Sequence, residues 1–260
     1  VSFVVTVDDA DDDFATGNGD DTFVVGGALT ATGTLNAGGE DDTLDINTTE
    51  AVNFTGATLS GFETLDLDAG GTNSALTILG SQFDAFTTIT ANADDAITIT
   101  TMNGVDITAS NADDTFVFGA DEAGATIASF STSDVLNLNA RVVTTDGYSE
   151  AVVGSPDFGA AGFFVIEDDV AGAGAAMNAG ALAALVSDDG SGFDNIGANE
   201  TAYFMFKADA SEVEDAFVYH VTANGDGTAF ASGTLIATLE DVADLSDPAF
   251  AAANFEITAG

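Results

Sequence analysis

The chain has 260 residues and carries 44 acidic side chains against two basic ones, for a formal net charge of -42 at pH 7. Such a charge repels a phosphate backbone and an anionic membrane surface, which argues against nucleic-acid binding and against binding to such membranes. Hydrophobic residues make up 46% of the chain, so a disordered acidic tail is excluded and a core can form, in one long domain or two modest ones.

No cysteine is present, so neither a disulfide nor a thiolate metal site can hold the fold together. A folded body of this charge repels itself and needs cations. Monovalent salt would screen the charge, as in a halophilic protein without specific ion sites, whereas bound divalent cations would neutralise it directly. There is no apolar run long enough to span a membrane, and no basic stretch precedes the first apolar run as in a signal peptide.

Residues 1–140 contain short stretches in which apolar and polar residues alternate. Each stretch is bounded by Gly, Asn or Asp, which is the pattern of a β-strand. A single helical turn is expected at GSQFDAF, residues 80–86. In chain order the predicted strands are DTFVVG (21–26), DTLDI (42–46), ETLDLDA (63–69), ALTILG (75–80), AITIT (96–100), VDITA (105–109), DTFVFG (114–119) and DVLNLNA (134–140).

Four of these units repeat a pair of aspartates, then Thr or Ala, then a large apolar residue. Similar units about 20 residues apart, or at multiples of that spacing, indicate a solenoid in which each coil stacks on the preceding one. The apolar residue two positions after the second aspartate is expected to point into the core. The units are GNGDDTF (17–23), GGEDDTL (38–44), ANADDAI (91–97) and SNADDTF (110–116).

The first unit resembles the nonapeptide of RTX proteins, G-G-x-G-x-D-x-U-x, which builds calcium-binding parallel β-rolls. Gly17, Gly19, Asp21 and Phe23 occupy the family positions, whereas Glu40 stands where the second unit should have a glycine. The third and fourth units have Ala or Ser at the glycine positions. The resemblance implies a calcium-binding parallel β-roll or β-solenoid over roughly residues 10–140.

Two further segments carry the resemblance. LSGFETLDL (59–67) and the Lys-poor, Thr-rich composition resemble RTX-type surface-layer proteins of Gram-negative bacteria. IASFSTSDVLNL (127–138) resembles the segment that closes β-rolls in type I secreted proteins. Both likenesses imply export from the cell.

The resemblance implies several bound Ca²⁺ ions at the aspartate turns. Ca²⁺ takes about six to eight oxygen ligands from carboxylates, backbone carbonyls and water, and glycine admits the backbone conformations that such turns need. Asp8–Asp13 is a second acidic cluster that could share an ion with the first turn, and a solvated acidic face is the alternative for every one of these groups. The candidate ligands are Gly17, Gly19, Asp20, Asp21, Gly38, Glu40, Asp41, Asp42, Asp94, Asp95, Asp113, Asp114 and Asp134.

Residues 141–260 differ in composition and are expected to form a second, mixed region. An Ala-rich stretch at residues 172–188 has helical spacing. We expect a small antiparallel sheet that caps one end of the solenoid, because a bare end exposes core and backbone. The predicted strands are GFFVIED (162–168), TAYFMFKA (201–208), DAFVYHVT (215–222) and GTLIATLED (233–241). The predicted fold is therefore mainly β, with a smaller, β-rich capping region that includes some α.

The sequence predicts no enzyme. It contains no G-x-S-x-G, H-E-x-x-H or phosphate-loop motif, and its single histidine, His220, lies in a strand pattern with no Ser or Cys motif beside it.

Two functions remain beside the halophile alternative. The first is a secreted, extracellular calcium-binding structural protein of a bacterial surface layer or similar assembly at the cell surface, which folds and assembles on binding Ca²⁺. Its candidate partners are further copies of the chain and a cell-surface polysaccharide. The second is the C-terminal secretion or adhesion module of a larger type I secreted protein.

Overall fold

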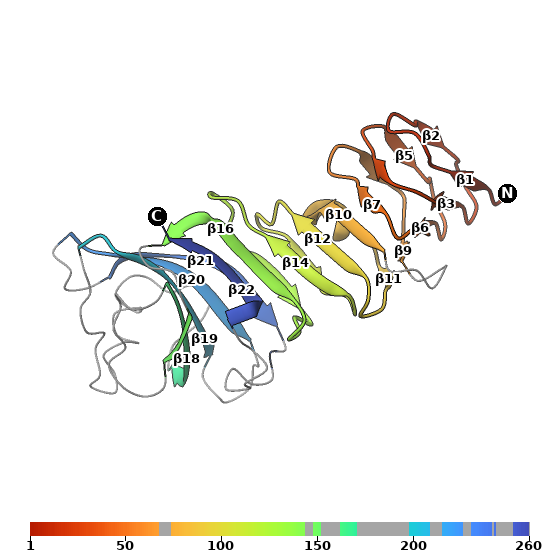
Figure 1. The fold of residues 1–260 in the computed structure, drawn as a ribbon. Helices are drawn as coiled ribbons and strands as arrows, with labels where there is room; N and C mark the ends of the chain where they lie inside the picture. The colour runs from red at the N-terminus through yellow and green to blue at the C-terminus, as the bar shows by residue number, and fades with distance from the viewer. Residues whose placement is uncertain are drawn as a thin grey trace. The chain divides into compact units, whose positions relative to one another are not determined.

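The computed structural model describes residues 1–67, 74–143, 148–151, 162–170, 198–208, 215–225, 230–240, 242 and 252–259. They belong to two compact units, Val1–Val117 and Phe118–Gly260 (Figure 1). Strands account for 53% of the structure and helix for 3%, and the parallel sheets form a β-solenoid of about six turns. The predicted β-solenoid is thereby confirmed. The predicted helix at 172–188 lies outside the described residues.

The first face of the first unit is a five-stranded parallel sheet, in the order β1-β3-β6-β9-β11. Thr22 lies beside Thr43, and Thr43 beside Thr64, so these coils repeat every 21 residues. The strands are β1 (Val4–Thr6), β3 (Thr22–Val25), β6 (Thr43–Ile46), β9 (Thr64–Asp66) and β11 (Thr88–Thr90).

The second face is also parallel, and within the first unit it runs in the order β4-β7-β10-β12-β14. Its last coil is shorter, because Ala96 lies beside Asp113, 17 residues further along the chain. The strands are β4 (Leu29–Thr30), β7 (Ala51–Asn53), β10 (Ala75–Leu79), β12 (Ala96–Thr100) and β14 (Asp113–Val117).

A third face consists of the parallel strands β2 (Phe14–Ala15), β5 (Thr34–Asn36) and β8 (Thr58–Ser60). These strands were not predicted, because two or three residues are too few to show alternation. After β10 the chain forms helix α1 (Gly80–Phe83), at the predicted helical turn. The described coils after α1 contain β11, β12, β13 (Asp106–Thr108) and β14, and none of these strands joins the third face.

The core of the solenoid is built from the apolar residues of the repeats. Phe23, Leu44, Ile97 and Phe116, each two positions after the second aspartate of its unit, have no exposed surface, as the sequence predicted. Aromatic rings also contact each other between coils: the ring centroids of Phe23 and Phe62 are 5.1 Å apart with the rings edge to face. Burial of these large apolar side chains stabilises each coil against the next.

The second unit contains a mixed sheet in the order β15-β21-β20-β19-β18-β17. Only β19-β20 and β20-β21 are antiparallel; β17-β18, β18-β19 and β15-β21 are parallel, so the expectation of an antiparallel sheet is wrong for these pairs. The strands are β15 (Ala125–Ala128), β17 (Tyr148–Ala151), β18 (Phe163–Val170), β19 (Thr201–Ala208), β20 (Ala216–Ala223) and β21 (Phe230–Glu240).

The C-terminal strands β21 and β22 continue the parallel pairing of the solenoid in the second unit. β21 pairs in parallel with β15, and β22 (Phe255–Ala259), which follows the 3-10 helix η2 (Ala252–Asn254), pairs in parallel with β16 (Val135–Val143). The domain boundary expected after residue 140 lies inside β16. On β20, Phe217, Tyr219 and Val221 are buried, but so is Val218 on the opposite face, so this strand is covered on both sides.

Candidate metal centre

Glycines shape the first two aspartate turns. Gly17, Gly19 and Gly38 have φ angles of 107°, 130° and 106°, in the left-handed region that favours glycine. Glu40, which stands at the second turn where the RTX pattern has glycine, has a φ of 85°. The second turn therefore keeps the backbone shape of the first, at the cost of a strained non-glycine residue.

The turns of successive coils stack on one another along the solenoid axis. A Cβ atom on Gly38 would collide with the backbone carbonyl of Gly17, and one on Gly61 would collide with the backbone of Gly38. The backbones of three successive coils thus approach one another more closely than any side chain allows. Backbone hydrogen bonds join the coils at this corner, because Gly39 N donates to Gly17 O at 3.1 Å and Gly19 N donates to Gly39 O at 3.2 Å.

The two aspartates of each pair have opposite environments. The first members, Asp20, Asp41, Asp94 and Asp113, are exposed, as is Glu40. The second members lie directly before a strand or, in the case of Asp114, at the start of β14, and they are 0–1% exposed, although a carboxylate is rarely buried without compensation. The buried residues are Asp21, Asp42, Asp95, Asp114 and, in the second unit, Asp134.

The acids that directly precede strands of the first face form a column along the stacked coils, which we call the first acidic ladder: the buried Asp21 and Asp42 and the half-buried Glu63. Each carboxylate accepts a hydrogen bond from the backbone of the preceding coil. Phe3 N donates to Asp21 Oδ1 at 2.7 Å, Asp21 N to Asp42 Oδ1 at 2.7 Å, and Asp42 N to Glu63 Oε2 at 2.9 Å. These charge-assisted bonds join the coils at their glycine corner.

One oxygen of each ladder aspartate stays unsatisfied. Asp21 Oδ2 and Asp42 Oδ2 are both buried and have no hydrogen-bond partner. Burial raises the pKa of Asp42 above its usual 3.8, the hydrogen bond from Asp21 N lowers it in part, and the neighbouring charges of Asp21, Glu63 and Asp20 raise it further. The ladder thus concentrates negative charge that the described side chains do not neutralise.

A second ladder lies at the start of the second-face strands and consists of Ser74, Asp95 and Asp114. In this ladder, both carboxylate oxygens of each aspartate accept a hydrogen bond. Asp95 accepts from Ser74 N at 2.8 Å and from Asn92 N at 2.9 Å, and Asp114 accepts from Ser110 N at 2.6 Å and Ser110 Oγ at 3.1 Å. These carboxylates close their own turns, so their burial is explained without an ion.

Asp134 in the second unit resembles the second ladder. Its Oδ2 accepts from Ser131 N at 2.6 Å, and its backbone carbonyl accepts from Asn254 Nδ2 at 2.8 Å. The predicted ligands therefore divide between two corners of the solenoid and a separate turn, instead of forming a single row.

The Asp8–Asp13 cluster forms its own small arrangement. Ligand atoms of Asp8, Asp9 and Asp12 lie within 4.8 Å of one another, and Asp12 Oδ2 accepts from the backbone N–H groups of Asp8 and Asp9 at 3.2 and 3.1 Å. The three residues are exposed or half-exposed. Exposed acidic groups often lie close together without an ion, so this cluster alone is not evidence for a bound cation.

Sequence reasoning missed Glu63, the third member of the first acidic ladder. The available signal was its context, because Glu63-Thr64-Leu65 repeats the acid-Thr-apolar order of Asp42-Thr43-Leu44. Phe62 stands where the other units have their first aspartate, which hid the correspondence.

A further carboxylate pair was also missed, on the strands of the first face. Asp45 on β6 lies beside Asp66 on β9. Burial raises the pKa of Asp45, and the charge of Asp66 raises it further. Asp45 Oδ1 is buried without a hydrogen-bond partner. Like charges that lie side by side on paired strands destabilise a sheet unless they are neutralised.

No family model, curated protein or solved structure matches this chain at a significant level. Among the described residues, no helix is long and apolar enough to cross a membrane.

Proposed function

We propose that this chain is a calcium-binding structural protein whose solenoid is held together by cations at the first acidic ladder. The observation that carries the proposal is the pair of buried, unpartnered oxygens Asp21 Oδ2 and Asp42 Oδ2. They lie on successive coils, 21 residues apart, at a corner where glycine backbones are in close contact.

Electrostatics support a cation at this corner. A buried carboxylate that is neither paired nor fully hydrogen-bonded costs several kcal/mol, on the order of 3–5 when a buried charge loses its partner. The chain has only two basic side chains, Arg141 and Lys207, against 44 acidic ones. Counter-charge at the ladder must therefore come from solution.

The ligand chemistry favours calcium. Asp21, Asp42 and Glu63 would supply carboxylate oxygens, and the turns at residues 17–20 and 38–41 would add backbone carbonyls. A set of mixed carboxylate and carbonyl oxygens on two adjacent turns suits Ca²⁺, which accepts irregular geometry, better than Mg²⁺, which demands a near-octahedral site. Asp95, Asp114 and Asp134 make their own hydrogen bonds, so the proposal does not rest on them.

The extracellular role follows from the RTX resemblance and from the energetics of weak calcium sites. Cytosolic calcium is too dilute to fill them, so the chain would remain export-competent inside the cell and fold outside. Ligand that binds only the folded state adds stability that grows with the logarithm of its concentration relative to Kd. We propose that the folded solenoid then forms part of a surface layer or a similar extracellular assembly.

Circular dichroism of the full chain tests this function. At physiological temperature the spectrum in millimolar Ca²⁺ should show the β content of the solenoid, whereas in chelator most of the chain should be expanded and should regain this content only on cooling. Mg²⁺ should restore the fold poorly. Equal β content in chelator and in Ca²⁺ would refute calcium-dependent folding, and full restoration by sodium chloride alone would favour the halophile alternative.

A further inference from the structure

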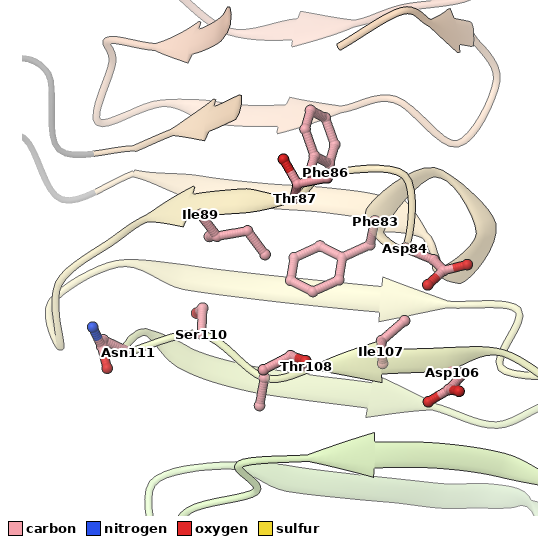
Figure 2. Close-up of a pocket in the computed structure, with 11 residues that line it drawn as sticks. Phe83, Asp84, Phe86, Thr87, Ile89, Asp106, Ile107, Thr108, Ser110 and Asn111 are labelled. Carbon is pink, nitrogen blue, oxygen red and sulfur yellow. The ribbon is translucent and has the colours of Figure 1, made fainter. Parts of the chain in front are cut away.

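A groove with a volume of about 460 Å³ opens on the first unit between β11 and β13 (Figure 2). This volume is within the range of ligand pockets. Apolar side chains of Phe83, Ile89 and Ile107 contribute to its walls. Phe83 and Ile107 are buried and Ile89 is half-buried, so the apolar surface is largely recessed.

The groove arises where the solenoid changes its cross-section. β11 is the last strand of the first face, and β13, on the next coil, is the terminal strand of a different sheet. The two strands run in the same direction in Figure 2 but do not pair with each other. The backbone hydrogen bonding between strands therefore stops here, and the unpaired edges of β11 and β13 both border the groove.

The hydrogen bonds of β11 show which of its backbone groups face the groove. Thr88 N donates to Glu63 O, and Thr90 O accepts from Leu67 N, so Thr88 and Thr90 bond toward β9. Alternate residues of a parallel strand bond to opposite neighbours. The N–H and C=O of Ile89 therefore point to the other edge, toward the groove that Ile89 lines.

The groove also has a charged end. Asp84 and Asp106 both lie at one end in Figure 2, and both are exposed. Ser110 and Asn111 lie at the opposite end. None of the lining residues carries a positive charge. A ligand with a cationic group at the Asp84–Asp106 end complements this distribution.

We propose that the groove binds an extended peptide of a partner protein as an added strand, with a Lys or Arg near the carboxylates of Asp84 and Asp106. The backbone of the peptide pairs with the edges of β11 and β13, and alternate side chains contact Ile89 and Ile107. A second copy of this chain is a poor donor, because it has only two basic residues. The occupant is therefore a more basic protein. This inference is independent of calcium binding.

Fluorescence anisotropy with the full chain in Ca²⁺ tests the proposal with a labelled hexapeptide that begins with Lys and continues with alternating Thr and Val. We expect saturable binding. The same peptide N-methylated at alternate residues should not bind, because it cannot complete the backbone ladder. A version that begins with Glu should bind at least about fivefold more weakly.

Variants locate the site. Asp84→Asn/Asp106→Asn should reduce the affinity for the Lys peptide by about fivefold and abolish the preference for Lys over Glu. Asp94→Asn/Asp113→Asn, which changes the net charge equally at exposed positions outside the groove, should change neither. Three outcomes would overturn the proposal. They are equal binding of the methylated and unmethylated peptides, equal binding of the Lys and Glu peptides, and no saturable binding of the Lys peptide. The methylation comparison needs no variant and holds if a variant misfolds.

Discussion

The second oxygen of each buried aspartate distinguishes the two ladders at the scale of single residues. In Asp95 and Asp114 both oxygens accept hydrogen bonds, whereas in Asp21 and Asp42 only Oδ1 does. The same motif, an acid followed by Thr or Ala and then an apolar residue, therefore closes a turn at one corner and leaves a buried carboxylate oxygen without a partner at the other. Spacing alone does not reveal this difference, because it depends on which N–H groups each turn presents.

Asp42 gives a prediction about pH. Its raised pKa means that the folded, metal-free chain binds a proton more tightly than the unfolded chain. The stability linked to this group is fully present below the unfolded pKa of 3.8 and is lost as pH rises through the higher folded pKa. In chelator, the free energy of unfolding should therefore increase as pH is lowered from neutral into the mildly acidic range.

A control separates the effect of Asp42 from the effect of the net negative charge of the chain, whose magnitude also decreases as pH is lowered. Urea unfolding at several pH values should show a shallower pH dependence for Asp42→Asn than for Asp41→Asn, which changes an exposed neighbour. Identical slopes for the two variants would mean that the buried group does not contribute.

Glu40 gives a second prediction. Because its φ is 85°, Glu40→Gly should raise the metal-free free energy of unfolding by about 1 kcal/mol. If Glu40 also donates an oxygen to calcium, as the sequence suggested, the same variant should bind calcium more weakly. Thermal unfolding in chelator and calcium titration measure the two effects separately. A lower melting temperature in chelator would contradict the strain argument.

At the scale of elements, the long strands of the first and second faces were predictable and the third face was not. β10 and β12 are five residues long and alternate clearly, whereas β2 has two residues and no readable period. The position of α1 was predictable, but its anchoring was not. Buried Gln82 donates from Nε2 to the carbonyls of Phe54 and Ala57, which lie 28 and 25 residues away in the chain.

The glycine corner gives a prediction for the coil stack. Gly38→Ala should destabilise the protein by about 3 kcal/mol, because the residue has a positive φ and its Cβ would collide with Gly17. Gly17→Ala is the matched control, since Gly17 has almost the same φ, 107°, but a Cβ there meets nothing within 4 Å. Chemical denaturation measures both changes. A loss of similar size in the control would show that close coil contact is not the cause.

At the scale of the whole molecule, charge governs association. Unpaired strand edges promote association, but a chain of net charge -42 repels its copies. Calcium that is bound inside the turns or shared between chains lowers this repulsion.

We therefore expect reversible assembly on adding calcium, dissolved again by chelator and supported poorly by magnesium. Light scattering across a calcium titration at high protein concentration measures it. A chain that folds with calcium yet stays monomeric would contradict assembly and favour the C-terminal module of a larger secreted protein.

Calcium titration calorimetry on three forms of the full chain tests the central claim most directly. The native chain and Asp94→Asn/Asp113→Asn should bind calcium alike and gain melting temperature with it. Asp21→Asn/Asp42→Asn keeps an oxygen for each backbone N–H but removes the charge, so it should lose binding at the first acidic ladder and most of the gain in melting temperature. Equal stoichiometry and affinity in all three forms, or no calcium binding by the native chain, would contradict the assignment of the ladder as the cation site.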